Sequence, residues 1–231
     1  MLESARARIL DQLDPGAVVL DIGGWGDPLE RADWVMDLMP YGTRGLYERE
    51  GWIAPRPKQP ERFGPGTWIA RDLCDREPYP FADDAVDFVV CGHTLEDLRD
   101  PLWVCSEMNR IAKAGYIEVP SRLEEQSWGV AGPFVGWPHH RWLIDLDGDR
   151  LEFAIKLHSL HARPEHQFPR AFWEGLSAEQ RVEALWWEGG FDFAEIPLFD
   201  AESSDRHARA PVARMLGEQP PAGRLRRLLR R

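Results

Sequence analysis

Short apolar runs recur along the first half of the chain and predict buried strands. They are bounded by polar or turn-forming residues and lack the alternation of half-buried strands, a pattern typical of parallel sheets. We expect strands at Val18–Asp21, Trp34–Asp37, Thr67–Ala70, Val86–Cys91 and Tyr116–Val119.

Helical spacing appears before and between these runs. Apolar residues recur at helical offsets in residues 3–13, and a longer helix begins at Asp100-Pro101, an acidic cap followed by proline at the first helical position. The longer helix leads directly into the strand at 116–119. Strand, crossover helix and strand predict a parallel α/β sheet whose strands end at one edge, where ligands bind.

The second half of the chain carries signals for a hairpin and a further helix. Asp147-Gly148 lies between two alternating segments, which predicts a β-hairpin. Ser177 with Gln180 resembles a capping box, so we expect a helix through "QRVEALWWEGG" that ends at Gly189. The predicted fold is therefore α/β and doubly wound, with a mainly parallel sheet of about seven strands and a β-hairpin added after strand five.

The chain length suits a single domain. We expect it over residues 1–199, followed by a linker and basic tail at 200–231. Residues 48–66 are rich in proline and glycine and indicate a surface insertion, which either covers a site or has no role. Residues 123–170 hold the hairpin and several aromatic side chains spaced by glycines, which either line an acceptor site or pack the hairpin onto the sheet. These aromatic residues are Trp128, Phe134, Trp137 and Trp142.

The charge balance narrows the classes of partner. A net charge of −11 disfavours general binding to nucleic acid or to anionic lipid. The tail "AGRLRRLLRR" is the exception, because its arginines and leucines have helical spacing. Such a helix either docks its leucines on the domain or touches a partner or a membrane surface.

Cysteine usage and hydropathy indicate the compartment. Cys74, Cys91 and Cys105 form an odd count without a CxxC pair, so neither a disulfide framework nor a zinc site is predicted. No run of 18 apolar residues occurs, and the N-terminus is too charged for a secretory signal. We expect a soluble cytoplasmic protein, whose oligomeric state the sequence leaves open.

The stretch "DIGGWGDP" has the acid and glycines of a nucleotide-binding turn but little room for a helix. Only twelve residues, Ile22 to Asp33, separate the first two strands, and Asp27 adds a carboxylate where phosphates would lie. A pyrophosphate needs amide groups at a helix N-terminus and would be repelled here. A cationic cofactor with a ribose suits the acids better.

The middle of the chain resembles a known family. Residues 68–122 contain an acid after the third strand, the element Tyr79-Pro80-Phe81, an aspartate pair, the strand "VDFVVCGHTLEDL", a helix and a fifth strand. In order and spacing these parts resemble the class I S-adenosylmethionine-dependent methyltransferases, and the resemblance extends over about residues 16–122. It implies a Rossmann-like fold and S-adenosylmethionine as cofactor.

The cofactor chemistry assigns roles to the residues at the predicted edge. We expect Asp21 to organise the methionine ammonium and Gly23 and Gly24 to let the backbone approach the ligand. Asp37 ends the second strand and suits both ribose hydroxyls. The resemblance further implies that Asp72 contacts the adenine amino group with Leu73 beside it. Cys91, which ends the predicted fourth strand, completes the set of expected cofactor contacts.

Two positions depart from the family pattern. Trp25 takes the place of the middle glycine, with Pro28 soon after, which resembles a subgroup with a glycine and proline variant of the first motif. The Trp25 ring either packs under the loop in place of the missing helix or faces the ligand. Asp97 stands where many relatives have histidine.

Methyl transfer requires an oriented acceptor and, for a hydroxyl, a base. His93 follows the fourth strand and is one candidate; hydrogen bonding to backbone at a strand end is the alternative. His139 and His140 enter the hairpin and are further candidates. At most one of them should reach a given site, because neighbours on a strand point to opposite faces. We expect no metal site among the remaining histidines and their acidic neighbour, which lack suitable spacing. These are His158, His161, His166 and Glu165.

The sequence therefore predicts a methyltransferase that acts on a small-molecule or saccharide-linked acceptor. Two alternatives remain at this point. One is a regulatory or assembly module that binds S-adenosylmethionine without turnover, and the other is an NAD-dependent oxidoreductase.

Overall fold

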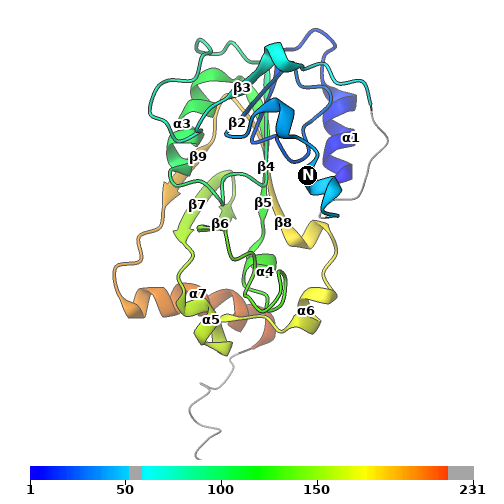
Figure 1. Cartoon of the computed structure of the whole chain (residues 1–231). Coiled ribbons are helices and arrows are strands. Elements are labelled where there is room, and N and C mark those ends of the chain that lie inside the picture. The colour runs from blue at the N-terminus through cyan, green and yellow to red at the C-terminus, as the bar shows by residue number, and fades with distance from the viewer. Residues whose placement is uncertain (52–58, 218–231) are drawn as a thin grey trace, which may run out of the picture. The chain divides into compact units, whose positions relative to one another are not determined.

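The computed structural model describes residues 1–51 and 59–217 and divides the chain into two compact units (Figure 1). Unit 1 comprises Met1–Val119, Gly148–Arg150 and Ala184–Phe193. Unit 2 comprises Pro120–Asp147, Leu151–Glu183 and the residues from Ala194 onward. The main boundary between the two units falls at the end of the fifth strand, and the domain predicted for residues 1–199 stays a prediction.

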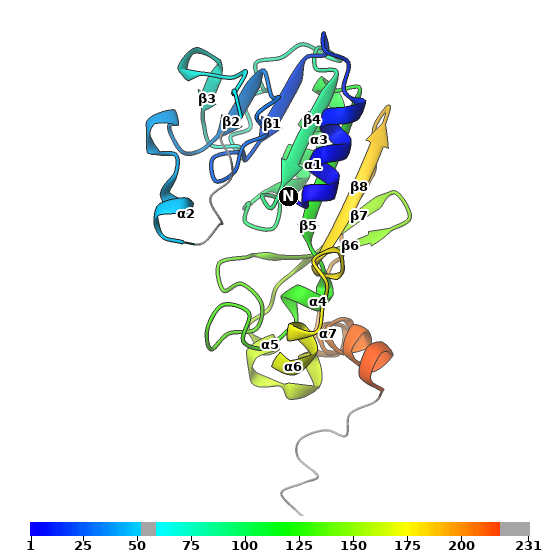
Figure 2. The ribbon, with the colours of Figure 1, turned by 90° about the vertical axis from the view of Figure 1, so that its right-hand side faces the viewer.

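A six-stranded sheet has the order β3-β2-β1-β4-β5-β8, which can be followed in Figure 2. Four neighbouring pairs are parallel: β1 with β2, β1 with β4, β2 with β3, and β4 with β5. The strands are β1 (Val19–Ile22), β2 (Trp34–Asp37), β3 (Trp68–Ala70), β4 (Phe88–Gly92), β5 (Ala114–Pro120) and β8 (Val182–Glu188). The five strands predicted from apolar runs are therefore confirmed, with shifts of at most two residues at their ends.

Helices cover both faces of this sheet, as a doubly wound fold requires. In Figure 1, α1 (Glu3–Gln12) and α3 (Pro101–Ile111) lie on opposite sides of the strands. The Asp100 carboxylate accepts the Trp103 backbone N–H at 3.2 Å, which confirms the predicted cap of α3. A short helix, α2 (Leu46–Arg49), and two 3-10 turns, η1 (Tyr41–Thr43) and η2 (Pro65–Thr67), complete the described helices of unit 1.

The core of unit 1 explains why the apolar runs form the inner strands. All four residues of β1 are buried, and Val19 packs with Ile9 of α1 in one apolar cluster. A strand covered on both faces excludes water from all of its side chains, so alternation is absent. Asp21 is the single acidic residue of β1 and is 3% exposed.

Unit 2 contains most of a second sheet, of order β6-β7-β9. Its strands are β6 (Trp142–Asp147), β7 (Arg150–Ile155) and β9 (Asp192–Glu195). The predicted β6–β7 hairpin is confirmed, and Gly148 has the positive φ of 66° that its turn needs. The described helical elements are α4 (Arg122–Glu125), α5 (Ser159–Ala162), η3 (Pro164–His166), α6 (Arg170–Glu174), η4 (Glu179–Arg181) and α7 (Ala201–Leu216).

The helix predicted through residues 177–189 is wrong. Its capping interactions do form, since Gln180 Oε1 accepts the Ser177 N–H at 2.9 Å and Ser177 Oγ accepts the Gln180 N–H at 3.3 Å. Only the single turn η4 follows, and the chain then enters β8 at Val182. A local cap can start a turn, but pairing at the edge of the sheet decided the conformation of this β-branched and aromatic segment.

The segment after residue 199 also differs from the prediction. Residues 201–216 form α7 instead of an irregular linker, and the Asp200 carboxylate caps it by accepting the Ser203 N–H at 2.7 Å. Part of the predicted insertion, residues 52–58, and the basic tail, residues 218–231, lie outside the described residues.

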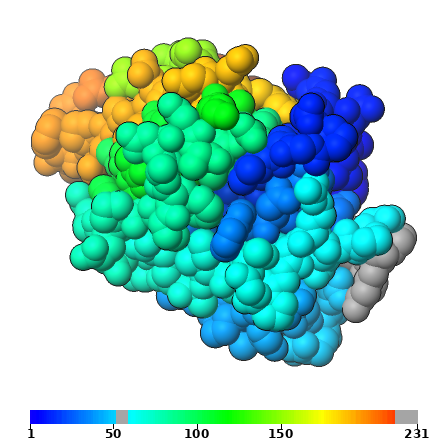
Figure 3. All heavy atoms as spheres, turned by 90° about the horizontal axis from the view of Figure 1, so that it is seen from above, coloured from blue at the N-terminus to red at the C-terminus, as the bar shows by residue number. Residues whose placement is uncertain are grey.

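The surface of unit 1 includes the segment that leads from β3 to β4, shown in cyan to green in Figure 3. This segment contains the Tyr79-Pro80-Phe81 element, whose Tyr79 side chain is buried and donates its hydroxyl to the Leu73 carbonyl at 2.9 Å. Over the described part of the chain, no helix is both long and apolar enough to cross a membrane.

Candidate functional site

The parallel strands of unit 1 bring the predicted cofactor residues to one edge. Asp21 precedes the last residue of β1, Asp37 ends β2, and Asp72 and His93 follow β3 and β4. Because β1 pairs in parallel with both β2 and β4, these ends point the same way. The tertiary structure thus assembles the edge that the sequence predicts.

The turn after β1 is built on the Asp21 carboxylate. Its Oδ2 atom accepts the Leu29 backbone N–H at 2.7 Å and closes the loop between β1 and β2. A Cβ atom at Gly24 would lie 2.7 Å from Cγ of Asp21, and one at Gly23 would lie 2.0 Å from Oγ1 of Thr94. Both positions therefore require glycine, and Gly23 also has a φ of 79°.

Asp37 holds the same turn from the neighbouring strand. Its Oδ2 atom accepts the Trp25 backbone N–H at 3.1 Å, and its Oδ1 atom accepts the Met39 N–H at 2.8 Å. Each oxygen of an ionised carboxylate has a second acceptor site. Asp37, which is 8% exposed, keeps capacity for two more donors.

Arg6 of α1 binds the loop between β1 and β2 through hydrogen bonds and ion pairs. This residue was not identified from the sequence. The buried guanidinium donates to the Pro28 and Asp27 carbonyls at 3.3 Å each and forms ion pairs with Asp27 and Glu30. The charge of Asp27 is therefore balanced by Arg6. This corrects the expectation that the Asp27 carboxylate by itself would repel a pyrophosphate. The available signal was an arginine near apolar residues on a short amphipathic helix.

The Trp25 ring packs into unit 1. The side chain is 9% exposed, lies edge-on to Tyr47 with ring centroids 5.0 Å apart, and donates Nε1–H to Thr43 Oγ1 at 2.9 Å. Of the two roles open for Trp25, this geometry supports packing under the loop in place of a helix.

Burial gives the two strand-end acids unusual electrostatics. Burial raises the pKa of Asp21 to about 7, although the Leu29 N–H and Arg6 oppose the shift. Burial also raises the pKa of Asp37, against the N–H groups of Met39 and Trp25. Neighbouring buried carboxylates are stabilised in their charged form by a cation, so this edge favours a positively charged ligand.

The residues after β3 are anchored by a second unpredicted arginine. Asp72 Oδ2 accepts from Arg99 at 2.5 Å and Oδ1 accepts the Cys74 N–H at 2.9 Å. The hydrogen bond from Arg99 lowers the pKa of the half-exposed Asp72 carboxyl. Leu73 is 4% exposed, and Cys91 is fully buried in β4 with a pKa raised by burial. Their cofactor contacts stay predictions.

His93 is held by carboxylates at the end of β4. It has a φ of 52°, and its Nε2 atom lies 2.9 Å from Oε1 of Glu118 on β5, with Nδ1 3.7 Å from Glu96. The His93 side chain is 42% exposed. Partial desolvation opposes the charged form, but the two carboxylates raise the pKa of His93 to about 9. A protonated imidazole does not accept a proton, so this environment disfavours the predicted role of His93 as a base.

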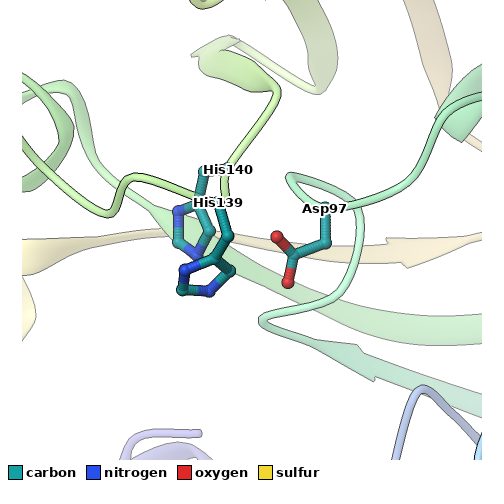
Figure 4. Close-up of side chains that lie close together, drawn as sticks. All are labelled: Asp97, His139 and His140. Carbon is teal, nitrogen blue, oxygen red and sulfur yellow. The ribbon is translucent and has the colours of Figure 1, made fainter.

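His139 and His140 belong to unit 2 and lie side by side (Figure 4). Their ring centroids are 4.5 Å apart at an interplanar angle of 80°. The expectation that they point to opposite faces is wrong, because both lie in the turn before β6 and not in the strand itself. Asp97, drawn in the same figure, belongs to unit 1.

A buried carboxylate of unit 2 orients His140. Glu125 is 1% exposed, and its Oε1 atom lies 2.7 Å from Nδ1 of His140. Its other oxygen accepts from Lys156, which also donates to the Trp137 carbonyl at 2.8 Å. His140 and Lys156 lower the pKa of Glu125 against its burial. A carboxylate on Nδ1 fixes the ring and its tautomer, as in many general bases.

The aromatic residues expected near an acceptor also lie in unit 2. Trp128, Phe134 and Trp137 are 37–42% exposed, which is unusual for such large apolar side chains. The Trp137 ring lies 6.0 Å from each imidazole of His139 and His140. Trp142, by contrast, packs edge-on against Phe153.

The remaining histidines considered as metal ligands bind other protein groups. His161 Nδ1 accepts the Val135 backbone N–H at 3.2 Å, and His166 Nε2 lies 2.9 Å from Oδ1 of Asp205. His166 is buried and ties the 3-10 turn η3 to α7. These contacts give both residues a structural role.

Comparisons with known proteins agree with the geometry of unit 1. Residues 58–117 match the family described as a methyltransferase domain. A search of curated proteins found no match to this chain.

Several solved structures are similar to part of the chain. A methyltransferase in complex with the Trm112 methyltransferase activator of Haloferax volcanii is 20% identical, with 52% of this chain and 50% of that chain covered and a TM-score of 0.36. A SAM-dependent methyltransferase from Aquifex aeolicus is 18% identical, with 51% and 64% covered and a TM-score of 0.35. A methyltransferase from Bacillus halodurans is 19% identical, with 51% and 52% covered and a TM-score of 0.34. The chain thus spans 50–64% of the length of these structures.

The matched residues include β3 at one edge of the six-stranded sheet, β4 next to β1, and the helix α3, whereas the turn after β1 lies outside the match. Residues 58–117 therefore match a methyltransferase domain, and the parallel strands of unit 1 agree with the Rossmann-like fold that the sequence resemblance implies.

Proposed function

We propose that unit 1 binds S-adenosylmethionine and that the protein transfers its methyl group to a small-molecule or saccharide-linked acceptor. The observation that carries this proposal is the pair of buried acids, Asp21 and Asp37, at the ends of adjacent parallel strands. A phosphate-bearing cofactor would meet these carboxylates without a helix N-terminus to bind it.

The groups at this edge fit the proposed cofactor. Asp37 has one acceptor site left on each oxygen, which matches the two hydroxyl donors of a ribose. Asp21 lies beside the glycine turn and favours a cation such as the methionine ammonium. The exposed side of Asp72, with Leu73, suits an adenine amino group. When bound, S-adenosylmethionine supplies an electrophilic methyl carbon on a cationic sulfur.

Side-chain hydrogen bonds also explain how the loop between β1 and β2 keeps its conformation without a long helix. Carboxylates of Asp21 and Asp37 accept backbone N–H groups of Leu29 and Trp25, and Arg6 binds two carbonyls of the same loop. The loop is therefore preorganised by side chains, which lowers the entropy lost when a ligand binds.

For a hydroxyl acceptor, we assign the base to His140. Glu125 fixes Nδ1 of His140, whereas His93 is held in its protonated form by Glu118. The exposed Trp137 next to the two imidazoles suits stacking on a flat or sugar-like acceptor. Glu125 acts through His140 and is a positioning residue.

The first test separates the two functions that bind S-adenosylmethionine from the oxidoreductase. S-adenosylhomocysteine should raise the melting temperature of the purified protein, and NADH fluorescence should not change on mixing. A nicotinamide-dependent oxidoreductase predicts the reverse result. Loss of both signals would contradict any cofactor role for this edge.

The second test asks for turnover. The protein is incubated with S-adenosylmethionine labelled in the methyl group and with a small-molecule extract, and transfer is followed over many equivalents. Sustained labelling supports a methyltransferase. Binding without labelling supports the alternative, a cofactor-binding regulatory or assembly module, which the salt-bridged His93 favours.

The proposal places the protein in the cytoplasm. All three cysteines are free and buried, as expected for a protein of a reducing compartment. Fractionation of cells that express the native chain would test this location.

A further inference from the structure

Unit 2 contains a cavity of about 730 Å³ that the proposed methyl transfer does not use. All of its lining residues belong to unit 2. One face of α7 forms one wall, with Arg206, His207, Ala210 and Arg214 at helical spacing. The volume lies within the range of small-molecule sites in proteins.

A second part of the lining, here called the acidic wall, consists of carboxylates from three strands. Asp145 and Asp147 lie two residues apart on β6. Glu152 lies on β7, and Glu183 is the second residue of β8. Residues two apart on a strand share a face, so the two aspartates of β6 point the same way. This wall is negative.

Two of these carboxylates, Asp145 and Glu183, differ in their ion partners. Asp145 has Arg122 at 3.5 Å as an ion partner. Among the residues that the structure describes, Glu183 forms no ion pair. Burial raises the pKa of the Glu183 carboxyl, and the nearby Asp145 raises it further. Glu183 thus lies near the charge of Asp145 and has no ion partner of its own among the described residues.

Arg214 lines the cavity, and three further basic residues of the lining contact other groups. The buried Arg122 donates to Oε1 of Gln126 at 2.9 Å and to the His207 carbonyl at 2.9 Å, and its Nη1 lies 2.7 Å from Nε2 of His207. Burial lowers the pKa of His207 to about 4, with Arg122 as a second cause, so this ring is neutral at pH 7. Arg206 lies 4.0 Å from Glu202 on its own helix.

Most of the remaining lining is apolar. Leu146, Ile196, Leu198 and Met215 contribute hydrocarbon surface to the same cavity. A ligand that fits both walls carries one positive group and an apolar body, because the ammonium satisfies the carboxylates while the hydrocarbon leaves water.

We propose that this cavity binds an organic amine, with its ammonium between Asp145 and Glu183 and its hydrocarbon against Leu198 and Met215. The site is distinct from the cofactor edge of unit 1, since every residue that forms it lies in unit 2. The proposal does not depend on methyl transfer.

The test uses the full chain and three probes of equal chain length: n-hexylammonium, 1-hexanol and hexanoate. Titration calorimetry at pH 7 should show saturable binding of n-hexylammonium, with 1-hexanol weaker by at least about tenfold and hexanoate without binding. Equal affinities for 1-hexanol and n-hexylammonium would mean that apolar contacts alone cause the binding, and would overturn the ammonium assignment.

Variants locate the binding. Glu183→Gln keeps the size and shape of the side chain and breaks no ion pair. It should lower the affinity for n-hexylammonium by at least about tenfold. Glu174→Gln is the matched control, because this exposed acid of unit 2 does not line the cavity and pairs with Arg170. Unchanged affinity in Glu183→Gln, with circular dichroism equal to that of the parent protein, would refute the proposal.

A competition experiment excludes the cofactor edge, which is also acidic. The titration is repeated with S-adenosylhomocysteine in large excess, and the affinity for n-hexylammonium should stay the same. If S-adenosylhomocysteine abolishes amine binding, the amine occupies unit 1 and the cavity assignment is wrong. If S-adenosylhomocysteine does not bind at all, the proposed function fails while the amine titration with Glu183→Gln still decides the cavity.

Discussion

Nε2 of His93 lies 2.9 Å from Oε1 of Glu118, and this pair ties the end of β4 to β5 within unit 1. Burial would raise the pKa of Glu118, but His93 and the N-terminal ammonium lower it to about 2. Tyr116 and the Leu2 N–H complete the hydrogen bonds of this carboxylate. The imidazolium is therefore part of a structural ion cluster.

Stability should depend on pH through this pair. The pKa of His93 is raised to about 9 in the folded protein, so its contribution is complete below the unfolded value of about 6.5 and is lost as pH rises through about 9. Denaturant unfolding at pH 6 and pH 10 should show a larger loss for the parent protein than for His93→Gln. Equal losses in the two proteins would argue against the ion pair.

Cofactor affinity should fall in mild acid because of Asp21. Its pKa is about 7 in the free protein, and a cationic ligand needs the ionised form. Below pH 7 the dissociation constant for S-adenosylmethionine should rise by up to about tenfold per pH unit. Calorimetry at pH 5.5 and pH 8 on the parent protein and on Asp21→Asn checks this, since the variant should bind weakly at both values. A parent affinity that does not change with pH contradicts the assignment.

The same shift predicts the opposite trend for the unliganded protein. A carboxyl whose pKa is raised by folding contributes stability below its unfolded value of about 3.9, and this contribution is lost as pH rises through about 7. Asp21→Asn should therefore be less sensitive than the parent protein to a change from pH 5 to pH 8 in denaturant unfolding.

Asp37→Ala should weaken S-adenosylmethionine binding by about ten- to a hundredfold, because two charge-assisted hydrogen bonds to the ribose are lost. The control is Asp11→Ala, an exposed acid of α1. Calorimetry on both variants gives the comparison. If Asp37→Ala binds as the parent protein does, the ribose assignment is wrong.

Trp25→Gly should reduce the free energy of unfolding by about 3 kcal/mol, a typical cost of deleting a buried aromatic ring. The affinity for S-adenosylhomocysteine should change less, since the ring packs on Tyr47 and Thr43. Trp25→Phe keeps an aromatic ring and loses the Thr43 hydrogen bond, at about 1 kcal/mol. A variant with normal stability and lost affinity would instead place the ring against the ligand.

His140→Ala should lower kcat by about 10²- to 10⁴-fold on a hydroxyl acceptor, once one is found, and leave cofactor affinity unchanged. His139→Ala is the neighbouring control and should have a smaller effect on kcat. Glu125→Gln should lower kcat as well and flatten the dependence of kcat on pH. Similar kcat values for His140→Ala and the parent protein would show that His140 is not the base.

Much of the fold followed from local pattern. The runs at 18–21 and 34–37 predicted adjacent buried strands, and Asp100-Pro101 predicted the start of α3, because burial on both faces and helix capping act over a few residues. The helix prediction for residues 177–189 was wrong because it also rested on a local signal. Its capping box is local and does form, but the strand that follows depends on a partner far away in the chain.

The sequence alone determined which residues gather at the cofactor edge, because parallel strands and acids at their ends fix that edge whatever the loops do. The tertiary structure decided the charge state and partners of those residues. Arg6 neutralises Asp27, Glu118 holds the proton on His93, and Glu125 orients His140. Each of these contacts joins residues at least 15 positions apart, and the energy of a buried charge depends on such partners and not on its neighbours in sequence.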